Sequence, residues 1–222
     1  MPTRLLPQGI RGLTHAHPVL LMAAVATIAA GVMTSATVVK LDAALGGLAR
    51  TAASVIPTDA GFAISTLGGT EMVMPLTAAS ALLLCALREW RGALTVVLSV
   101  VGTQGLVALV KGTVERPRPE SNSAMADASG FSFPSAHSAT AMALYATLTF
   151  LAAGACSGRA RAAVALAGFS LVTAVGLSRV LLAAHYPTDV LAGWLTGAAV
   201  VGASWLVVRR LGGPRAAASA RP

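Results

Sequence analysis

Charged residues are scarce in this sequence. Asp, Glu, Lys and Arg make up 11% of its 222 residues, whereas soluble globular domains carry about a quarter. The mean hydropathy is correspondingly high, at +0.75. This composition excludes an ordinary soluble domain and indicates a chain that crosses a membrane.

Aromatic residues and cysteines are also few, and each scarcity excludes a class of function. Aromatic residues make up only 5% of the chain, too few for a platform that stacks nucleic-acid bases. The net charge of +8 comes from basic residues that separate apolar runs, so membrane topology explains it better than a nucleic-acid partner. Cys85 and Cys156 lie in apolar runs without metal-ligand spacing, so neither a disulfide nor a metal role is expected.

Long apolar runs are what the sequence has in place of charge. Residues 18–39 hold no charged side chain before Lys40, which is enough to cross a hydrocarbon core of about 30 Å as a helix. A signal peptide is the alternative, but its apolar region would usually be ~7–15 residues, so a retained span is favoured. Five further spans are predicted over residues 70–87, 92–110, 134–155, 162–182 and 190–208.

These runs predict an all-α fold, a six-span transmembrane helical bundle that forms one domain over residues 18–208. Residues 1–17 are expected to be a cytoplasmic segment, and residues 209–222 a disordered cytoplasmic tail. Between the first two spans, residues 41–66 carry an apolar stripe beside charged positions. They predict an amphipathic helix in the membrane interface, broken at Pro57. An ordered loop over the bundle explains them nearly as well.

Lysine and arginine are divided unevenly between the two sides of this topology. The N-terminal segment, the loops after the second and fourth spans and the C-terminal tail hold ten, and the other side holds six. Because cytoplasmic loops are enriched in these residues, both termini are predicted to be cytoplasmic, in a multi-pass plasma-membrane protein. The polar motifs described next then fall on the extracytoplasmic side.

The stretch Ser178–Asp189, read SRVLLAAHYPTD, places three ionisable side chains in an apolar chain. Such groups are costly at membrane depth and are kept mainly where they have a partner or a task. Pro187 is a good first residue for a helix, so Asp189 would lie in the first turn. Asp189 could then hold one ring nitrogen of His185 and leave the other free to attack. Arg179 adds a planar cation suited to phosphate or carboxylate.

Two earlier segments complete a pattern. They read KGTVERPRP over Lys111–Pro119 and PSAH over Pro134–His137. With Ser178–Asp189, the chain resembles the type 2 phosphatidic acid phosphatase superfamily, in its integral-membrane branch. The motifs of that family are Lys-x6-Arg-Pro, Pro-Ser-Gly-His and Ser-Arg-x5-His-x3-Asp, and their order and spacing together are specific. Ala136 stands where the family commonly has Gly; at the start of a helix, Ala can still offer its backbone N–H to an anion.

The resemblance implies the role of each residue. His185 would be the nucleophile, Asp189 would orient it, and His137 would be the general acid for the leaving group. The phosphate oxygens would be bound by Lys111, Arg118, Ser135, Ala136 and Arg179.

The chemistry of phosphoryl transfer requires groups of the same kinds. It needs an in-line nucleophile and neutralised charge on the equatorial oxygens, and fixed cations, a hydroxyl and a helix N-terminus can supply that neutralisation. The sequence contains no Asp and Glu cluster of metal-ligand type, so neither a metal nor another cofactor is expected.

Each residue alone also has a simpler explanation. His137 could cap its helix, His185 could be an interfacial hydrogen-bonding residue, and Lys111 and Arg179 could snorkel at span ends. Arg116 is expected to be an exposed charge on the outer face. The shared spacing and sidedness favour the enzyme over a non-catalytic lipid-phosphate binder or transporter. The six spans favour it over the haloperoxidase branch.

The expected reaction is hydrolysis of a phosphomonoester or pyrophosphate on a membrane lipid, through a phosphohistidine intermediate. The resemblance implies three candidate lipids: polyprenyl (undecaprenyl-type) pyrophosphate, phosphatidic acid and phosphatidylglycerol phosphate. The first is favoured, only because recycling of the cell-wall carrier would place it on the outer face. The sequence does not specify the oligomeric state.

Overall fold

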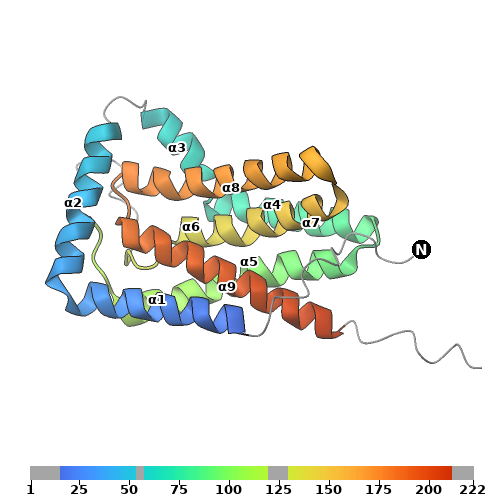
Figure 1. The fold of residues 1–222 in the computed structure, drawn as a ribbon, viewed down its shortest axis with the longest axis horizontal. Helices are drawn as coiled ribbons and strands as arrows, with labels where there is room; N and C mark the ends of the chain where they lie inside the picture. Colours follow the sequence, from blue (N-terminus) through green and yellow to red (C-terminus); the bar gives the residue numbers. More distant parts are fainter. Residues whose placement is uncertain (1–15, 54–57, 120–129, 212–222) are drawn as a thin grey trace, which may run out of the picture.

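The computed structural model describes residues 16–53, 58–119 and 130–211, and within these ranges the chain is helical and has no strand. The long helices run alongside one another, and α2 crosses one end of the bundle (Figure 1). The helices are α1 (Ala16–Thr34), α2 (Ala36–Ala53), α3 (Thr58–Thr66), α4 (Thr70–Ala86), α5 (Trp90–Val114), α6 (Ala136–Ala141), the π-helical turn η2 (Met142–Ala146), α7 (Thr147–Ala155), α8 (Gly158–Leu181) and α9 (Pro187–Leu211).

The predicted membrane-bundle class is confirmed. Among the described residues, five helical segments are long and apolar enough to cross a bilayer: α1, α5, the continuous α6–η2–α7, α8 and α9. The count becomes six when the pair α3 and α4, which is bent by 40° at a short break, is taken as one span. Large apolar side chains such as Leu82, Leu109 and Phe169 are exposed on the outside of the bundle, as lipid-facing side chains would be.

The first span is shorter than predicted. The expected helix over residues 18–39 ends at Thr34, and α2 begins at Ala36 in a new direction (Figure 1). Ser35 separates the two helices, and its side-chain oxygen accepts the N–H of Val38 at 3.3 Å. A Ser in this position caps the start of a helix, so the break has a local cause. Hydropathy does not reveal it, because the residues on both sides are apolar.

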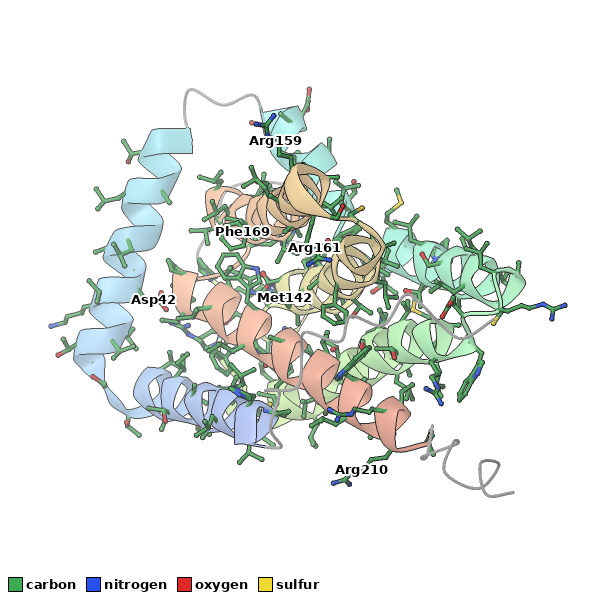
Figure 2. The ribbon with its side chains drawn as sticks, turned by 45° about the vertical axis from the view of Figure 1, so that its right-hand side comes forward. Asp42, Met142, Arg159, Arg161, Phe169 and Arg210 are labelled. Atoms are coloured by element: carbon green, nitrogen blue, oxygen red, sulfur yellow. The ribbon has the colours of Figure 1, made fainter. Side chains whose placement is uncertain are left out.

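The amphipathic prediction for residues 41–66 is divided between two helices. Their bounds show that α2 ends at Ala53 and α3 begins at Thr58, while Pro57 lies outside the described residues. On α2, Leu41, Leu45 and Leu48 are exposed, whereas Asp42 is 1% exposed. Figure 2 shows Asp42 pointing inward from α2, towards the start of α9. The acidic residue of α2 therefore faces the protein, and its leucines face outward.

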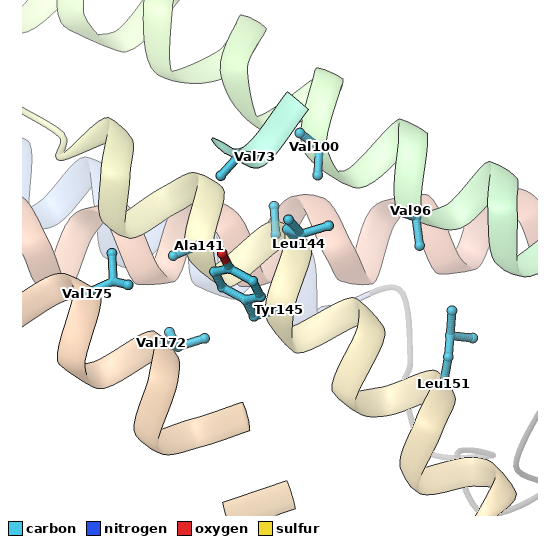
Figure 3. Packing of buried hydrophobic residues seen from close by; sticks show 10 residues of the cluster. Val73, Val96, Val100, Ala141, Leu144, Tyr145, Leu151, Val172 and Val175 are labelled. Carbon is cyan, nitrogen blue, oxygen red and sulfur yellow. The ribbon is translucent and has the colours of Figure 1, made fainter. Parts of the chain in front are cut away.

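The core lies where α4, α5, α8 and the middle of the fourth span meet. Figure 3 shows Val96 and Val100 of α5 on one side of Leu144, with Val172 and Val175 of α8 on the other. Helix α9 packs closely on α6, because Gly197 has no side chain: a Cβ there would lie 2.5 Å from the carbonyl oxygen of Ala139. Small residues allow such close approach between membrane helices.

Hydrogen bonds hold the turn between α3 and α4 against the fourth span. The hydroxyl of Tyr145, in η2, donates to the carbonyl oxygen of Leu67 at 2.6 Å. Thr140 donates to the carbonyl oxygen of Gly68 at 2.9 Å. A Cβ at Gly68 would lie 2.9 Å from the backbone oxygen of His137. The turn therefore packs directly on the start of the fourth span and limits how His137 can move.

Candidate active site

All three sequence motifs meet at the end of the bundle that α2 crosses. The first motif spans the end of α5 and the segment after it, the second begins α6, and the third joins α8 to α9 (Figure 1). Arg159 and Arg161 lie at the start of α8 and Arg210 near the end of α9, so all three lie at the opposite ends of these helices from the third motif. The structure thus brings together the eight residues singled out from the sequence: Lys111, Arg118, Ser135, Ala136, His137, Arg179, His185 and Asp189.

His185 and Asp189 face each other as their spacing predicts. Helix α9 begins at Pro187, which puts Asp189 in its first turn. Oδ2 of Asp189 lies 3.4 Å from Nδ1 of His185 and accepts the backbone N–H of Tyr186 at 2.9 Å. Because a carboxylate only accepts hydrogen bonds, this arrangement favours a proton on Nδ1. The lone pair then lies on Nε2.

The environment of His185 keeps its ring neutral. The side chain is 3% exposed, and burial lowers its pKa to about 4 despite the opposing effect of the Asp189 carboxylate. Arg118 and Arg179 lower this pKa further, because like charges disfavour a second cation nearby. At neutral pH the Nε2 atom is therefore available as a nucleophile.

Basic side chains surround the reactive nitrogen. One guanidinium nitrogen of Arg118 lies 3.3 Å from Nε2 of His185 and donates to the carbonyl oxygen of Ala184 at 2.8 Å. Lys111 donates to the carbonyl oxygen of Phe131. Arg118 and Arg179 both lie close enough to act electrostatically on His185. Such a group of fixed cations suits a phosphate.

The second and third motifs are joined through the backbone. Ser135 caps α6: its side-chain oxygen accepts the N–H of Ser138 at 3.4 Å and the Ser138 hydroxyl at 3.0 Å. The N–H of Ser135 donates to the carbonyl oxygen of Asp189 at 2.9 Å. Ala136 is the first residue of α6, the position at which helix N–H groups are open to an anion. The backbone just before His137 is therefore fixed to the first turn of α9, which carries Asp189, the partner of His185.

The structure corrects the prediction for Arg116. It is 7% exposed, not an outer-face charge, and its guanidinium donates to Asp42 and Asp189 at 2.7 Å each. The reason is that the segment after α5 turns inward beneath α2, where two buried carboxylates need a cation. The sequence analysis assigned no role to Asp42. An acidic residue in an apolar helix is expected to be buried against a partner, by the same argument that applies to His185 and Asp189.

Ser65 is a further residue that sequence analysis missed. It lies near the end of α3, is 2% exposed and accepts a hydrogen bond from Arg179. The two residues are separated by 114 positions, and a serine in an apolar helix gives no indication of its partner. Through this bond, α3 helps to orient one of the predicted phosphate-binding cations.

Metal-ligand clusters are absent from the part of the chain that the structure describes. No three His, Cys, Asp or Glu side chains there gather in a way that could hold a metal ion. Two carboxylates at this end of the bundle, Asp42 and Asp189, are both engaged by Arg116.

Comparison with known proteins extends these observations. Residues 92–212, more than half of the chain and all three motifs, match the PAP2 superfamily. The sequence is 33% identical over 139 residues to phosphatidylglycerophosphatase B of Bacillus subtilis. That alignment covers 60% of this chain and 66% of the relative, just under two thirds of its length.

Two crystal structures share the fold. One is a transmembrane PAP2-type phosphatidylglycerolphosphate phosphatase from Bacillus subtilis, with a TM-score of 0.69 and 25% identity, covering 88% of this chain and 96% of that one. The other is LpxE of Aquifex aeolicus, with a TM-score of 0.56 and 21% identity, covering 73% and 93%. At this identity the second likeness concerns the fold alone. The resemblance drawn from the three motifs is therefore confirmed: the chain belongs to the PAP2 superfamily and has the helical fold of a membrane member.

Proposed function

We propose that the protein is a membrane lipid phosphatase that hydrolyses a phosphate ester through a phosphohistidine at His185. The observation that carries the proposal is the environment of Nε2. This nitrogen belongs to a buried neutral ring, is backed by Asp189 and lies 3.3 Å from the Arg118 guanidinium. A nucleophile next to a cation is the arrangement needed to attack a phosphorus atom that carries negatively charged oxygens. Family membership and the two membrane relatives support an enzyme over a binding protein.

The reaction would proceed in two displacements. Nε2 of His185 attacks phosphorus, the bond to the lipid oxygen breaks, and His137 gives that oxygen a proton. His137, now neutral, then takes a proton from water as the water oxygen attacks phosphorus. The phosphorus–nitrogen bond breaks, and inorganic phosphate leaves. Asp189 would stabilise the positive charge on the His185 ring in both steps.

The phosphate oxygens would be bound by cations that come from separate helices. Lys111 lies at the end of α5, Arg118 in the segment after it, and Arg179 at the end of α8. The side chain of Ser135 and the N–H of Ala136 would add donors at the start of α6. Because these donors are held by the fold before the substrate arrives, they would stabilise the transition state without reorganising.

We propose phosphatidylglycerol phosphate as the first candidate substrate. The names of the Bacillus subtilis sequence relative and of the Bacillus subtilis crystal structure both state that activity, and they describe the same kind of protein. Polyprenyl pyrophosphate, favoured from the predicted sidedness alone, becomes the second candidate, and phosphatidic acid the third. The test is phosphate release by purified protein from each lipid in mixed micelles, beside a His185→Ala control. Equal release by the control, or none from any lipid, would contradict the proposal.

Activity is expected to survive EDTA, because side-chain cations take the place of the divalent ion that most phosphoryl-transfer enzymes use. The measurement is the initial rate of phosphate release before and after dialysis against the chelator. A loss that magnesium restores would show that the cations of this site do not suffice.

The site is proposed to face the outside of the cell, with both termini in the cytoplasm. The Lys and Arg distribution supports this, since the basic loops and the site lie at different ends of the bundle. A reporter that is active only outside the cytoplasm should be active when fused after residue 125 and inactive when fused after residue 158. The reverse pattern would place the substrate in the inner leaflet.

A further inference from the structure

We infer that Arg116 and Asp42 act together as positioning residues for the catalytic pair. They hold the Asp189 carboxylate in the orientation that serves His185 while leaving its negative charge uncompensated. The inference rests on the proposed function, because it concerns how the proposed nucleophile is oriented. Asp42 lies outside the three motifs, and Arg116 occupies a variable position of the first, between Lys111 and Arg118. In the sequence, 74 positions separate them.

The two oxygens of Asp189 have different partners. Oδ2 faces Nδ1 of His185 and accepts the N–H of Tyr186. Oδ1 accepts a hydrogen bond from Arg116 at 2.7 Å. A carboxylate fixed at both oxygens cannot rotate, so Arg116 sets the plane in which Asp189 meets the His185 ring. The Asp189 side chain is fully buried, so water does not compete for either oxygen.

Arg116 is itself fixed on three sides. Its second terminal nitrogen donates to Oδ2 of Asp42 at 2.7 Å, and its first also donates to the hydroxyl of Thr188 at 2.9 Å. Its guanidinium stacks 4.0 Å from the ring centre of Tyr186. The planar fork of Arg allows it to bridge two carboxylates at once, which a lysine ammonium cannot do with the same geometry.

Asp42 connects this arrangement to α2. Its Oδ1 accepts the backbone N–H of Thr188 at 3.0 Å, and its Oδ2 accepts the Thr188 hydroxyl as well as Arg116. Asp42 therefore binds the first turn of α9 directly, one residue before Asp189. It is the single acidic residue of α2 and is buried, so its contacts anchor α2 to the start of α9.

The site combines two carboxylates, Asp42 and Asp189, with the single guanidinium of Arg116, and the sum of their charges suggests a reason. Asp42 and Arg116 form a neutral pair, so the negative charge of Asp189 remains to act on His185. When His185 attacks phosphorus, its ring becomes positive. The net charge of Asp42, Arg116, Asp189 and His185 then becomes zero. Without Asp42, the cation of Arg116 would offset the effect of Asp189 on the ring, since charges a few ångströms apart interact strongly in a buried site.

The test compares Asp42→Asn and Arg116→Lys, singly and combined, with the wild-type protein. Asp42→Asn keeps the shape but removes the compensating charge, and Arg116→Lys keeps a charge but loses the fork. Each single variant is expected to lower kcat by about 10- to 100-fold, the range in which small misplacements at a catalytic site act. KM is expected to change much less, because the phosphate-binding cations are untouched. The combined loss should be smaller than the product of the two, since the residues act as a unit.

Matched controls lie beside each position. Lys40→Gln on α2 and Glu115→Gln next to Arg116 change exposed side chains and should keep the wild-type kcat. Rates are divided by the amount of folded protein, which is measured as the monodisperse fraction in detergent. A variant that unfolds is then not mistaken for one that has lost catalysis. Single variants with kcat within about twofold of wild type, a loss confined to KM, or losses that simply multiply would each overturn the inference.

His185→Ala in the same assay distinguishes this failure from failure of the proposed function. An inactive His185→Ala protein beside fully active Asp42→Asn and Arg116→Lys proteins would overturn the positioning role and leave the nucleophile in place. Full turnover by His185→Ala would overturn the nucleophile, and the positioning role with it.

Discussion

His185→Ala is expected to abolish turnover and to leave no phosphorylated protein with any substrate. The side chain that would bond phosphorus is then gone, and no other imidazole is backed by a carboxylate within the described residues. The measurement uses a radiolabelled phosphate ester, a rapid denaturing quench and detection of acid-labile label on the protein.

His137→Ala is expected to fail in a different way. This change removes the proposed leaving-group acid and the later base for water, but the nucleophile is kept. A nitrophenyl phosphate needs little protonation as it leaves, so the variant should still phosphorylate itself and then accumulate the intermediate. General acid–base help is typically worth about 10²–10⁴-fold, so its turnover of lipid substrate should fall within that range. Acid-labile label on the His185→Ala protein would mean that a histidine other than His185 is the nucleophile.

Gly193→Ala is expected to reduce activity by about 100-fold, the effect of a displacement near 1 Å at a catalytic group. Gly193 lies on α9 against the start of α6, and a Cβ there would lie 2.6 Å from the backbone oxygen of Ser135. Backbone cannot yield as a flexible side chain does, so α6 must move, and the Ser135 cap and His137 must move with it. Overpacking of this kind also costs about 1–3 kcal/mol of stability.

The matched control is Gly105→Ala on α5, a helical position where a Cβ would meet nothing within 4 Å. This change should leave kcat intact and raise the thermal midpoint slightly, since Ala is favoured over Gly in a helix by roughly 0.5–1 kcal/mol. Both variants are assayed for phosphate release and for thermal unfolding in the same detergent. If Gly193→Ala were as active as Gly105→Ala, the α6–α9 contact would not position the site.

Much of the chemistry could be predicted from the sequence, because its signals are local. His185 and Asp189 meet because they are four positions apart, with a helix-starting proline between them that sets the first turn of α9. The membrane class followed from scarce charge and long apolar runs, because the length of a span is set by the bilayer. These features depend on neighbours in the chain, so they can be read without knowing the fold.

The burial of Arg116 was decided by tertiary structure. From the sequence, an arginine in a polar segment is expected to be exposed. Only the fold shows that a carboxylate from a distant helix lies beside Arg116. The Arg116–Asp42 and Arg179–Ser65 contacts join residues separated by 74 and 114 positions, and no periodicity within one helix encodes such a partner. A buried charge must find its counter-charge wherever the packed helices provide one. The sequence by itself thus determined which polar groups meet at one end of the bundle, and only the packing of α2, α3 and α9 decided what holds them in place.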